Sequence, residues 1–335
     1  MLGISGLLDE EDLTIMRYMK WSVCVAFLIV TGCAYVRIPF FPPVQPLQEQ
    51  VLEGEGKAKV LLLDISGIIT EKKGSGFSRK DSLVARIKEE LQKAEGDGSI
   101  VGIIVRINSP GGTVTATDTI YHELMQFKKR ADVKIIACLT GLATSGGYYV
   151  ASAADEIVAH PTSITGGIGV IAVKFTVDKF LSKIGIEQET IKSADKKDLW
   201  SPLRPSTSEE REIIQTIVNN LHERFVEVVL AGRGSFLSKE EIGRLADGRI
   251  FTADQAVEAR MIDEVGYLDD AVEEMKRSLE LEEAKVITYY RPGSYKGTIY
   301  SGFPVTSDKE INLIAINGDG LSIVPGVQFM YLWRP

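Results

Sequence analysis

The chain has 335 residues, 44% of them hydrophobic and 25% charged, which is the composition of a globular protein with enough apolar residues for a sizeable core. A formal net charge of −8 argues against a nucleic-acid partner, because no basic stripe offsets the acidic excess. The three cysteines, Cys24, Cys33 and Cys138, are too few and too badly spaced for a disulfide framework or a zinc site. We expect neither a metal nor an organic cofactor, since no His/Cys/Asp cluster has ligand spacing.

An apolar run at residues 21–36 follows Arg17 and Lys20 and is slightly shorter than the roughly 17–25 residues that a membrane-spanning helix needs. The basic residues before the run favour an uncleaved anchor with its positive side in the cytoplasm. A signal peptide is an alternative, since Val30-Thr-Gly-Cys33 resembles a bacterial lipobox in which Cys33 would carry lipid. Both interpretations place the rest of the chain outside the cytoplasm. A buried core helix is the third alternative.

The other segments differ in composition. Residues 1–20 precede the anchor, and residues 37–57 are rich in Pro, Gln, Glu and Gly without periodicity, which predicts a tether. The folded domain is expected at residues 58–290. In the tail, residues 291–335, Gly, Ser, Tyr and Pro become more frequent and periodicity fades. This tail is expected to pack as edge strands or as an arm between subunits.

Buried strands are predicted where continuous apolar runs occur, at residues 59–65, 100–107 and 134–139. Between these runs, apolar residues at helical spacing predict helices at 81–94 and 117–129. Strands that alternate with helices in this way indicate βαβ crossovers and a mostly parallel sheet. The fold class predicted is therefore α/β.

Three more elements are predicted further along the chain. Residues 156–159 form a short strand. A long helix begins in the capping-box pattern Ser206-Thr-Ser-Glu209, and Thr252 begins another short helix.

Two glycine motifs each lie between a predicted strand and a helix. In Asn108-Ser-Pro-Gly-Gly112, adjacent glycines let the backbone expose N–H groups at a helix N-terminus, as an oxyanion hole requires, although a plain tight turn is the alternative. In Ala143-Thr-Ser-Gly-Gly-Tyr-Tyr149, Ser145 could present its hydroxyl beside the Gly146 N–H, although a helix N-cap serine is common.

Two further motifs follow. Pro161-Thr-Ser-Ile-Thr-Gly-Gly-Ile-Gly169 is another glycine-rich loop, and Ile191-Lys-Ser-Ala-Asp-Lys-Lys-Asp198 precedes Trp200-Ser-Pro202. A lysine run is by itself most often a solvated surface. The histidines, His122, His160 and His222, all lie away from the glycine motifs in sequence, so a Ser-His-Asp triad has little to build on.

In this order and spacing, the four motifs resemble those of bacterial signal peptide peptidase A. The resemblance covers roughly residues 58–290, and Gly248–Ala256 with Ile262–Gly266 fits the same family. It implies a ClpP/crotonase-type spiral of ββα units that oligomerises. It also implies a serine endopeptidase held at the inner membrane with its catalytic domain periplasmic, acting on cleaved signal peptides and other short apolar peptides.

The resemblance assigns roles to particular residues. Ser145 aligns with the nucleophile and Lys197 with the general base, while Lys192 and Lys196 compete for the second role. The candidate oxyanion donors are Gly111, Gly112 and Gly146. Free lysine has a pKa near 10.4, so a lysine base must be desolvated or lie near positive charge to be neutral at working pH.

The sequence departs from the family pattern at two positions. Gly167 stands where the family has a serine that helps to position the lysine, and Ala194 stands at a usual glycine position. Thr165, Ser163 or a water would have to replace the missing hydroxyl. The first departure supports the alternative of a non-catalytic membrane scaffold. A crotonase-like acyl-CoA enzyme is the other alternative.

Overall fold

The computed structural model describes residues 46–71, 82–291, 316–317, 320–321 and 329–333. The predicted segments 1–20 and 21–36, with Cys33, lie outside the described residues. Within the described part, no helix combines the length and the apolar character that crossing a membrane requires.

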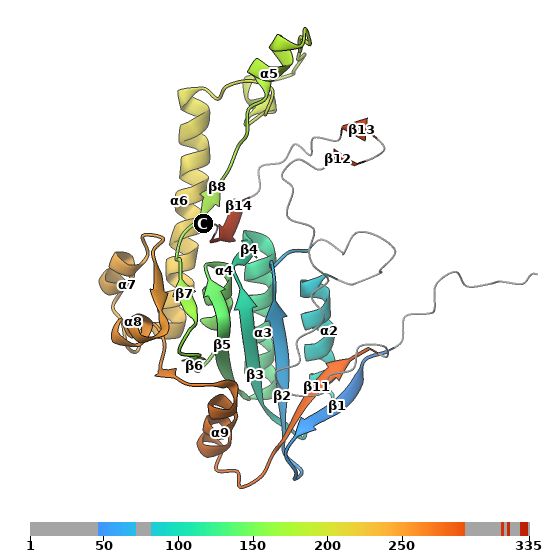
Figure 1. Ribbon diagram of the computed structural model, residues 1–335, viewed down its shortest axis with the longest axis vertical. Coiled ribbons are helices and arrows are strands. Elements are labelled where there is room, and N and C mark those ends of the chain that lie inside the picture. The colour runs from blue at the N-terminus through green and yellow to red at the C-terminus, as the bar shows by residue number, and fades with distance from the viewer. Residues whose placement is uncertain (1–45, 72–81, 292–315, 318–319, 322–328, 334–335) are drawn as a thin grey trace, which may run out of the picture. The chain divides into compact units, whose positions relative to one another are not determined.

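The described chain is built on a nine-stranded sheet whose main path is β1-β11-β2-β3-β5-β6-β10 (Figure 1). The strands of this path are β1 Gln48–Glu53, β2 Lys59–Ser66, β3 Ile100–Ser109, β5 Lys134–Thr144, β6 Glu156–Ala159, β10 Glu264–Val265 and β11 Lys285–Tyr290. All neighbours from β11 to β10 are parallel. The predicted mostly parallel α/β sheet and its buried strands are therefore confirmed.

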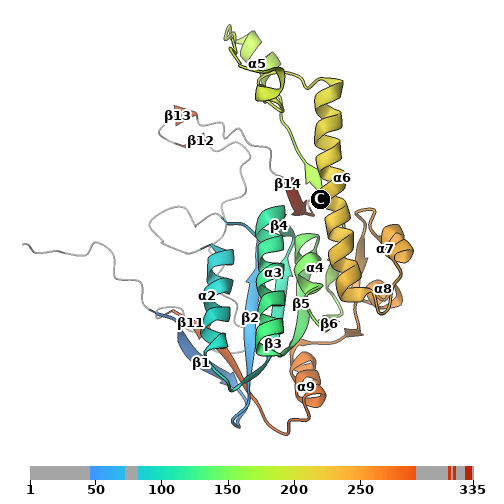
Figure 2. The same cartoon turned by 180° about the vertical axis from the view of Figure 1, so that it is seen from behind.

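Helices cover both faces of the sheet. From behind, α2 Leu83–Glu95, α3 Val114–Ala131 and α4 Gly146–Ala151 lie over the strands (Figure 2), and α9 Leu268–Ser278 covers the opposite face. Alternate residues of β2 explain the two layers, because Leu61 joins the core under α2 and α3 while Leu62 joins the core under α9. The sequences of these strands are continuously apolar because both faces of the sheet are buried.

Residues 37–57 are not a tether throughout, because they contain β1. This strand pairs antiparallel with β11 at the edge of the sheet. Most of its side chains are exposed or half-buried, so the segment has no apolar periodicity from which a strand could be predicted.

The long helix α6 spans Ser208–Arg233, and its N-cap is Thr207, one residue later than the predicted pattern. The reciprocal capping bonds join Thr207 and Glu210. Ser206 does not cap because its hydroxyl accepts a hydrogen bond from Lys174 Nζ at 2.8 Å. The remaining elements of this region are α7 Lys239–Leu245, β9 Ile250–Thr252 and α8 Ala253–Glu258, which Thr252 caps as predicted.

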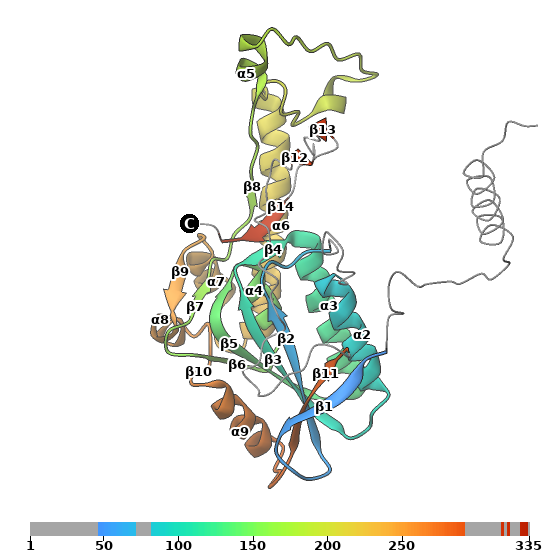
Figure 3. The same cartoon turned by 45° about the vertical axis from the view of Figure 1, so that its right-hand side comes forward.

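A second, three-stranded sheet has the order β4-β14-β8, with β4 Gly111–Thr113, β8 Ile171–Ala172 and β14 Phe329–Leu332 (Figure 3). The end of the predicted tail thus forms a central strand of a small sheet, not an edge strand. Two short strands, β12 Ile316–Asn317 and β13 Gly320–Leu321, pair with each other.

Residues 173–205, here called the arm, connect β8 to α6. The arm contains α5 Asp178–Lys183 and the 3-10 turn η1 Asp195–Asp198, and it lies beyond the N-terminal end of α6 (Figures 1 and 3). Its only described regular elements are these two short ones, and it carries the lysine motif of the sequence.

Candidate active site

Ser145 lies at the sharp turn between β5 and α4. Its backbone has φ 53° and ψ −115°, an unusual conformation for a residue with a side chain. The Ser145 N–H donates to the Gly166 carbonyl at 2.7 Å, which fixes the turn against the third glycine loop. The residue is only 2% exposed. This strained strand-to-helix turn is the geometry that presents a nucleophilic hydroxyl at the carboxyl end of a sheet.

The predicted oxyanion glycines lie beside Ser145, but they are not equivalent. A Cβ added at Gly111 would lie 2.7 Å from the backbone nitrogen of Gly146, so β4 and the start of α4 are in close contact. The Gly111 N–H already donates to Ser109 Oγ at 3.0 Å. Thr113 N–H and the Gly111 carbonyl bond to Ile69 on the other side of β4. Gly112 lies opposite Tyr331 of β14, and Gly146 directly follows Ser145 at the start of α4, where backbone N–H groups have no partner within the helix.

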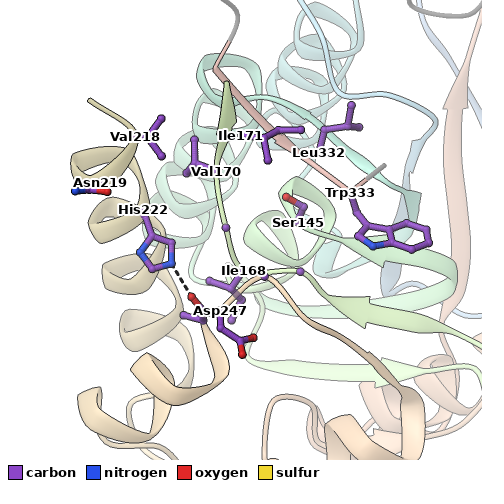
Figure 4. Close-up of a pocket in the computed structure, with 14 residues that line it drawn as sticks. Ser145, Ile168, Val170, Ile171, Val218, Asn219, His222, Asp247, Leu332 and Trp333 are labelled. Atoms are coloured by element: carbon purple, nitrogen blue, oxygen red, sulfur yellow. Dashed lines mark hydrogen bonds between the residues drawn. The ribbon is translucent and has the colours of Figure 1, made fainter. Parts of the chain in front are cut away.

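A pocket opens at Ser145 (Figure 4). The pocket is lined by residues from the Ser145 turn, the third glycine loop, the middle of α6, the loop before β9 and the last described residues of the chain. Its lining includes Ser145, Gly167, Ile168, Val218, His222, Asp247, Leu332 and Trp333. The sequence predicted the contributions of the two glycine loops. It did not predict those of α6 or of the C-terminus, because no local pattern relates residues so far apart in the chain.

His222 lies in this pocket together with Asp247, although neither is near Ser145 in sequence. His222 Nε2 is 2.8 Å from the Ala246 carbonyl oxygen, which can only accept, so Nε2 is the protonated nitrogen (Figure 4). Among the described residues, no hydrogen bond joins His222 to Ser145. The structure therefore brings a histidine into the pocket without forming a Ser-His-Asp triad.

Lys197 is not in the pocket of its own chain. It is exposed in η1 on the arm, where the adjacent Lys196 forms an ion pair with Glu209 in the first turn of α6. The pocket residues Val218 and His222 lie nine and thirteen residues further along α6. At 1.5 Å per residue this is roughly 14–20 Å of helix. A single chain therefore does not bring Ser145 and Lys197 together.

The three lysines of the motif at residues 191–198 differ in their contacts. Lys192 Nζ lies 2.7 Å from Asp198 Oδ1, and Lys196 pairs with Glu209. Lys197 has no ion pair and no side-chain hydrogen bond within the described ranges. Of the three candidates for a general base, it is thus the one whose amine is not already engaged.

The segment that carries Lys197 is fixed to α6 by Arg204. The Arg204 guanidinium contacts the carboxylates of both Asp198 and Glu210. Hydrogen bonds from Arg204 lower the pKa of Asp198 and lower the pKa of Glu210 to about 2. This cluster holds the residue after Lys197 at the N-terminal end of α6.

A buried aromatic cluster lies beside the Ser145 turn. Tyr149, four residues after Ser145, contacts the rings of Phe225 and Tyr331, each with centroids 5.0 Å away, and that of Tyr121 at 5.5 Å. The Tyr149 hydroxyl donates to Asp118, and burial together with this bond raises its pKa. The cluster joins α3, α4, α6 and β14.

Gly167 is the departure from the family pattern, and it lines the Ser145 pocket. Its φ is +65°, and an added Cβ would lie 3.3 Å from the Ser145 backbone nitrogen. A side chain at this position would therefore begin directly beside Ser145. The predicted substitutes are already engaged, because Ser163 Oγ donates to Leu139 O and Thr165 Oγ1 donates to Ala143 O.

Two family models match this chain. The model of peptidase family S49 matches residues 127–282, and the model of Clp protease matches residues 76–165. The second match includes β3, β4, β5 and the Ser145 turn, in agreement with the expected ClpP-like α/β fold.

Individual proteins are similar as well. The chain is 34% identical to "Putative signal peptide peptidase SppA" of Enterococcus faecium over 75% of this chain and 72% of that one. It is 30% identical to "Serine protease SPPA, chloroplastic" of Arabidopsis thaliana over 82% of this chain but only 40% of that one. Among solved structures, a mutant of ClpP1 from Listeria monocytogenes aligns with a TM-score of 0.41 and 18% identity, covering 63% of this chain and 94% of that chain.

Proposed function

This chain belongs to peptidase family S49 and is a serine peptidase, and we propose that Ser145 is its nucleophile and Lys197 its general base. The observation that carries the proposal is the strained turn at Ser145, which begins α4 and brings the Gly146 backbone nitrogen against Gly111 of β4. A serine held in this way at the N-terminal end of a helix, where backbone N–H groups have no partner within the helix, is suited to acyl transfer.

Lys197 reaches Ser145 from a neighbouring copy of the chain. The argument rests on the arm, which carries several large exposed apolar side chains: Val173, Phe175, Phe180, Ile184, Ile186 and Ile191. Such a concentration on one segment is typical of a protein–protein interface. Packing of the arm on a second subunit would bury these side chains and desolvate Lys197 at that subunit's pocket, which lowers the pKa of a lysine.

The reaction proceeds in two steps. Lys197 of one subunit removes the proton from Ser145 Oγ, which attacks the peptide carbonyl carbon while Gly112 and Gly146 stabilise the oxyanion. The C–N bond breaks as the lysine returns its proton to the leaving amine. A water activated by the same lysine then hydrolyses the ester and restores Ser145.

The substrates are peptides with apolar residues, including the remnants of cleaved signal peptides. Two features support this choice, namely the name of the Enterococcus faecium relative and the apolar lining of the pocket by Ile168, Val170 and Ile171. The apolar run at residues 21–36 would anchor the enzyme at the inner membrane, with its catalytic domain periplasmic or, if Cys33 carries lipid, attached as a lipoprotein.

The test is hydrolysis of a fluorogenic apolar peptide by the full chain in detergent. Ser145→Ala and Lys197→Ala are expected to be inactive alone, whereas a mixture of the two variants regains activity through subunits that pair an intact Ser145 with an intact Lys197. Lys192→Ala and Lys196→Ala are the matched controls and retain activity. Activity in the Lys197→Ala variant alone would contradict the assignment of the base.

A non-catalytic scaffold is the second candidate, and Gly167 is the observation in its favour. Labelling with a serine-directed fluorophosphonate separates the two functions. If the chain is catalytically active, the probe labels the wild type but not Ser145→Ala. An unlabelled wild type that retains its assembly would favour the scaffold.

A further inference from the structure

Thr144, the last residue of β5, directly precedes Ser145. The residue is fully buried, and its Oγ1 has no hydrogen-bond partner among the described residues. A buried hydroxyl without a partner has lost the hydrogen bonds that water gave it in the unfolded chain, which costs free energy. Folded proteins satisfy most of their buried polar groups, so an unpaired hydroxyl next to Ser145 calls for a partner that this single chain does not supply.

The neighbouring Thr165 shows how a threonine in this region is ordinarily satisfied. It lies opposite Ala143 in the parallel pairing of β5 with β7 Ile164–Gly166, and its Oγ1 donates to the Ala143 carbonyl oxygen at 2.8 Å. Thr144 lies opposite Gly166, one position further along the same pair of strands. Its hydroxyl has no such acceptor, so the two threonines differ in what their side chains can do.

Thr144 lies against Gly167, which lines the Ser145 pocket (Figure 4). A Cβ added at Gly167 would lie 3.6 Å from the Thr144 Cβ and 3.3 Å from the Ser145 nitrogen. Because Gly167 has no side chain, none of its own side-chain atoms separates Thr144 from the pocket. The unpaired hydroxyl therefore belongs to a residue directly behind the pocket wall, next to Ser145.

The proposed base, Lys197, needs an oxygen atom in this place. An ammonium group has three donors and no acceptor, so a lysine that leaves water for the pocket of a second subunit must find acceptors there. When the amine is neutral, its lone pair must also point at the Ser145 hydroxyl. The Asp247 carboxylate of the pocket is already paired with Arg249. A hydroxyl beside Ser145 that accepts from one lysine N–H would meet both needs.

We propose that Thr144 is the positioning residue for Lys197: its hydroxyl accepts a hydrogen bond from the Lys197 amine of a neighbouring subunit and turns that amine toward Ser145 Oγ. The inference rests on the proposed function, because it uses Lys197 as the base. It also gives Gly167 a different meaning. The hydroxyl that is absent at position 167 is supplied by the residue packed against it, so Gly167 does not by itself indicate a non-catalytic scaffold.

The first experiment replaces Thr144 by Val in the full chain in detergent, which removes the hydroxyl and keeps the shape of the side chain. For a fluorogenic apolar peptide, kcat is expected to fall about tenfold with KM unchanged, as the loss of one hydrogen bond to a charged group predicts. The melting temperature is expected not to fall, because the hydroxyl has no partner to lose within the described chain. Thr144→Ser is expected to keep most of kcat.

Thr165→Val is the matched control, since the hydroxyl that it removes is bonded to the Ala143 carbonyl. This variant is expected to lower the melting temperature and to keep the kcat of the folded enzyme. The two valine variants therefore change different quantities. A Thr144→Val protein that loses stability and keeps kcat would show a structural role for the hydroxyl and overturn the proposal.

The second experiment returns a hydroxyl from position 167. In the Thr144→Val background, Gly167→Ser is expected to recover most of the lost kcat, whereas Gly167→Ala, which shares the strain of φ +65°, recovers none. Two side chains that supply the same hydrogen bond are not additive. Thr144→Val is thus expected to cost about tenfold in the wild type and little in Gly167→Ser. An equal cost in both backgrounds would overturn the proposal.

The outcomes separate this inference from the proposed function. If Lys197→Ala retains activity, Lys197 is not the base, and the inference falls together with the proposed function. If Ser145→Ala and Lys197→Ala are both inactive while Thr144→Val keeps full kcat, only the role of Thr144 is overturned. Sedimentation velocity of each variant checks that a change in kcat does not come from a change in assembly.

Discussion

Arg204 Nε donates to the Asp198 carboxylate at 2.8 Å, so the residue directly after Lys197 is fixed by a guanidinium six residues further along the chain. The same guanidinium reaches Glu210, which is only 2% exposed in the first turn of α6. A planar guanidinium can bridge two carboxylates in this way, whereas an ammonium cannot reproduce the geometry. The position of the Lys197 backbone thus depends on a residue that takes no part in the chemistry.

Arg204→Ala is expected to reduce peptidase activity by about tenfold or more, because small displacements of a catalytic group have effects of this order. It is also expected to lower the free energy of unfolding by ~1–3 kcal/mol, since the buried Glu210 carboxylate loses its partner. Urea denaturation and peptide hydrolysis measure the two effects. The control is Arg244→Ala, whose exposed i,i+4 pair with Glu240 predicts little change.

Acid is expected to destabilise the α6 N-terminus through Glu210. Its pKa is lowered from 4.5 to about 2 in the folded chain by the Arg204 hydrogen bond. A lowered carboxyl pKa contributes stability that is complete above the unfolded value and is lost as pH falls through the folded value. Melting temperatures measured between about pH 5 and pH 2 are expected to fall more steeply for wild type than for Glu210→Gln. Parallel curves would contradict this.

Gly167→Ser is expected to raise kcat/KM severalfold relative to Gly167→Ala. Both variants place a Cβ near the Ser145 nitrogen and share the strain of φ +65°, which costs about 1–2 kcal/mol. Only the serine adds a hydroxyl that can accept a hydrogen bond from an arriving ammonium. The comparison therefore isolates the hydroxyl, and equal rates for the two variants would show that this chain does not require it.

Phe180→Asp is expected to convert the assembly to smaller species without unfolding the subunit. The side chain is 63% exposed on the arm, and a carboxylate there cannot be buried in an apolar interface. Sedimentation velocity measures the change, and peptidase activity is expected to fall with it. Val51→Asp, at a 46% exposed position on the edge strand β1, is the matched control and keeps the assembly.

The parts of the fold and site that the sequence predicted are local ones. The buried strands and the Ser145 turn could be predicted because apolar runs and glycine pairs act on neighbouring residues. Strand β1 could not be predicted, because it lies at the edge of the sheet and its side chains are largely exposed. The predicted capping residue of α6 was wrong by one position, because the Ser206 hydroxyl accepts a hydrogen bond from Lys174, which is far away in sequence.

The contributions of His222 and Tyr331 to the site were also missed. Each reaches the Ser145 region only through tertiary packing, His222 from the middle of α6 and Tyr331 from the end of the chain. A signal existed for Tyr331, since Phe329–Trp333 is an uninterrupted apolar and aromatic run suited to a strand. For His222 no local pattern marks the pocket.

The exposed position of Lys197 on the arm has a consequence for the newly made protein. Under the proposed dyad, a chain that has met no other copy has a strained Ser145 turn but no base within reach, so it is latent until it assembles. Its specific activity then depends on expression level, because each productive encounter needs two chains. The proposed arrangement therefore predicts a peptidase that is silent when copies are dilute and becomes active where copies accumulate.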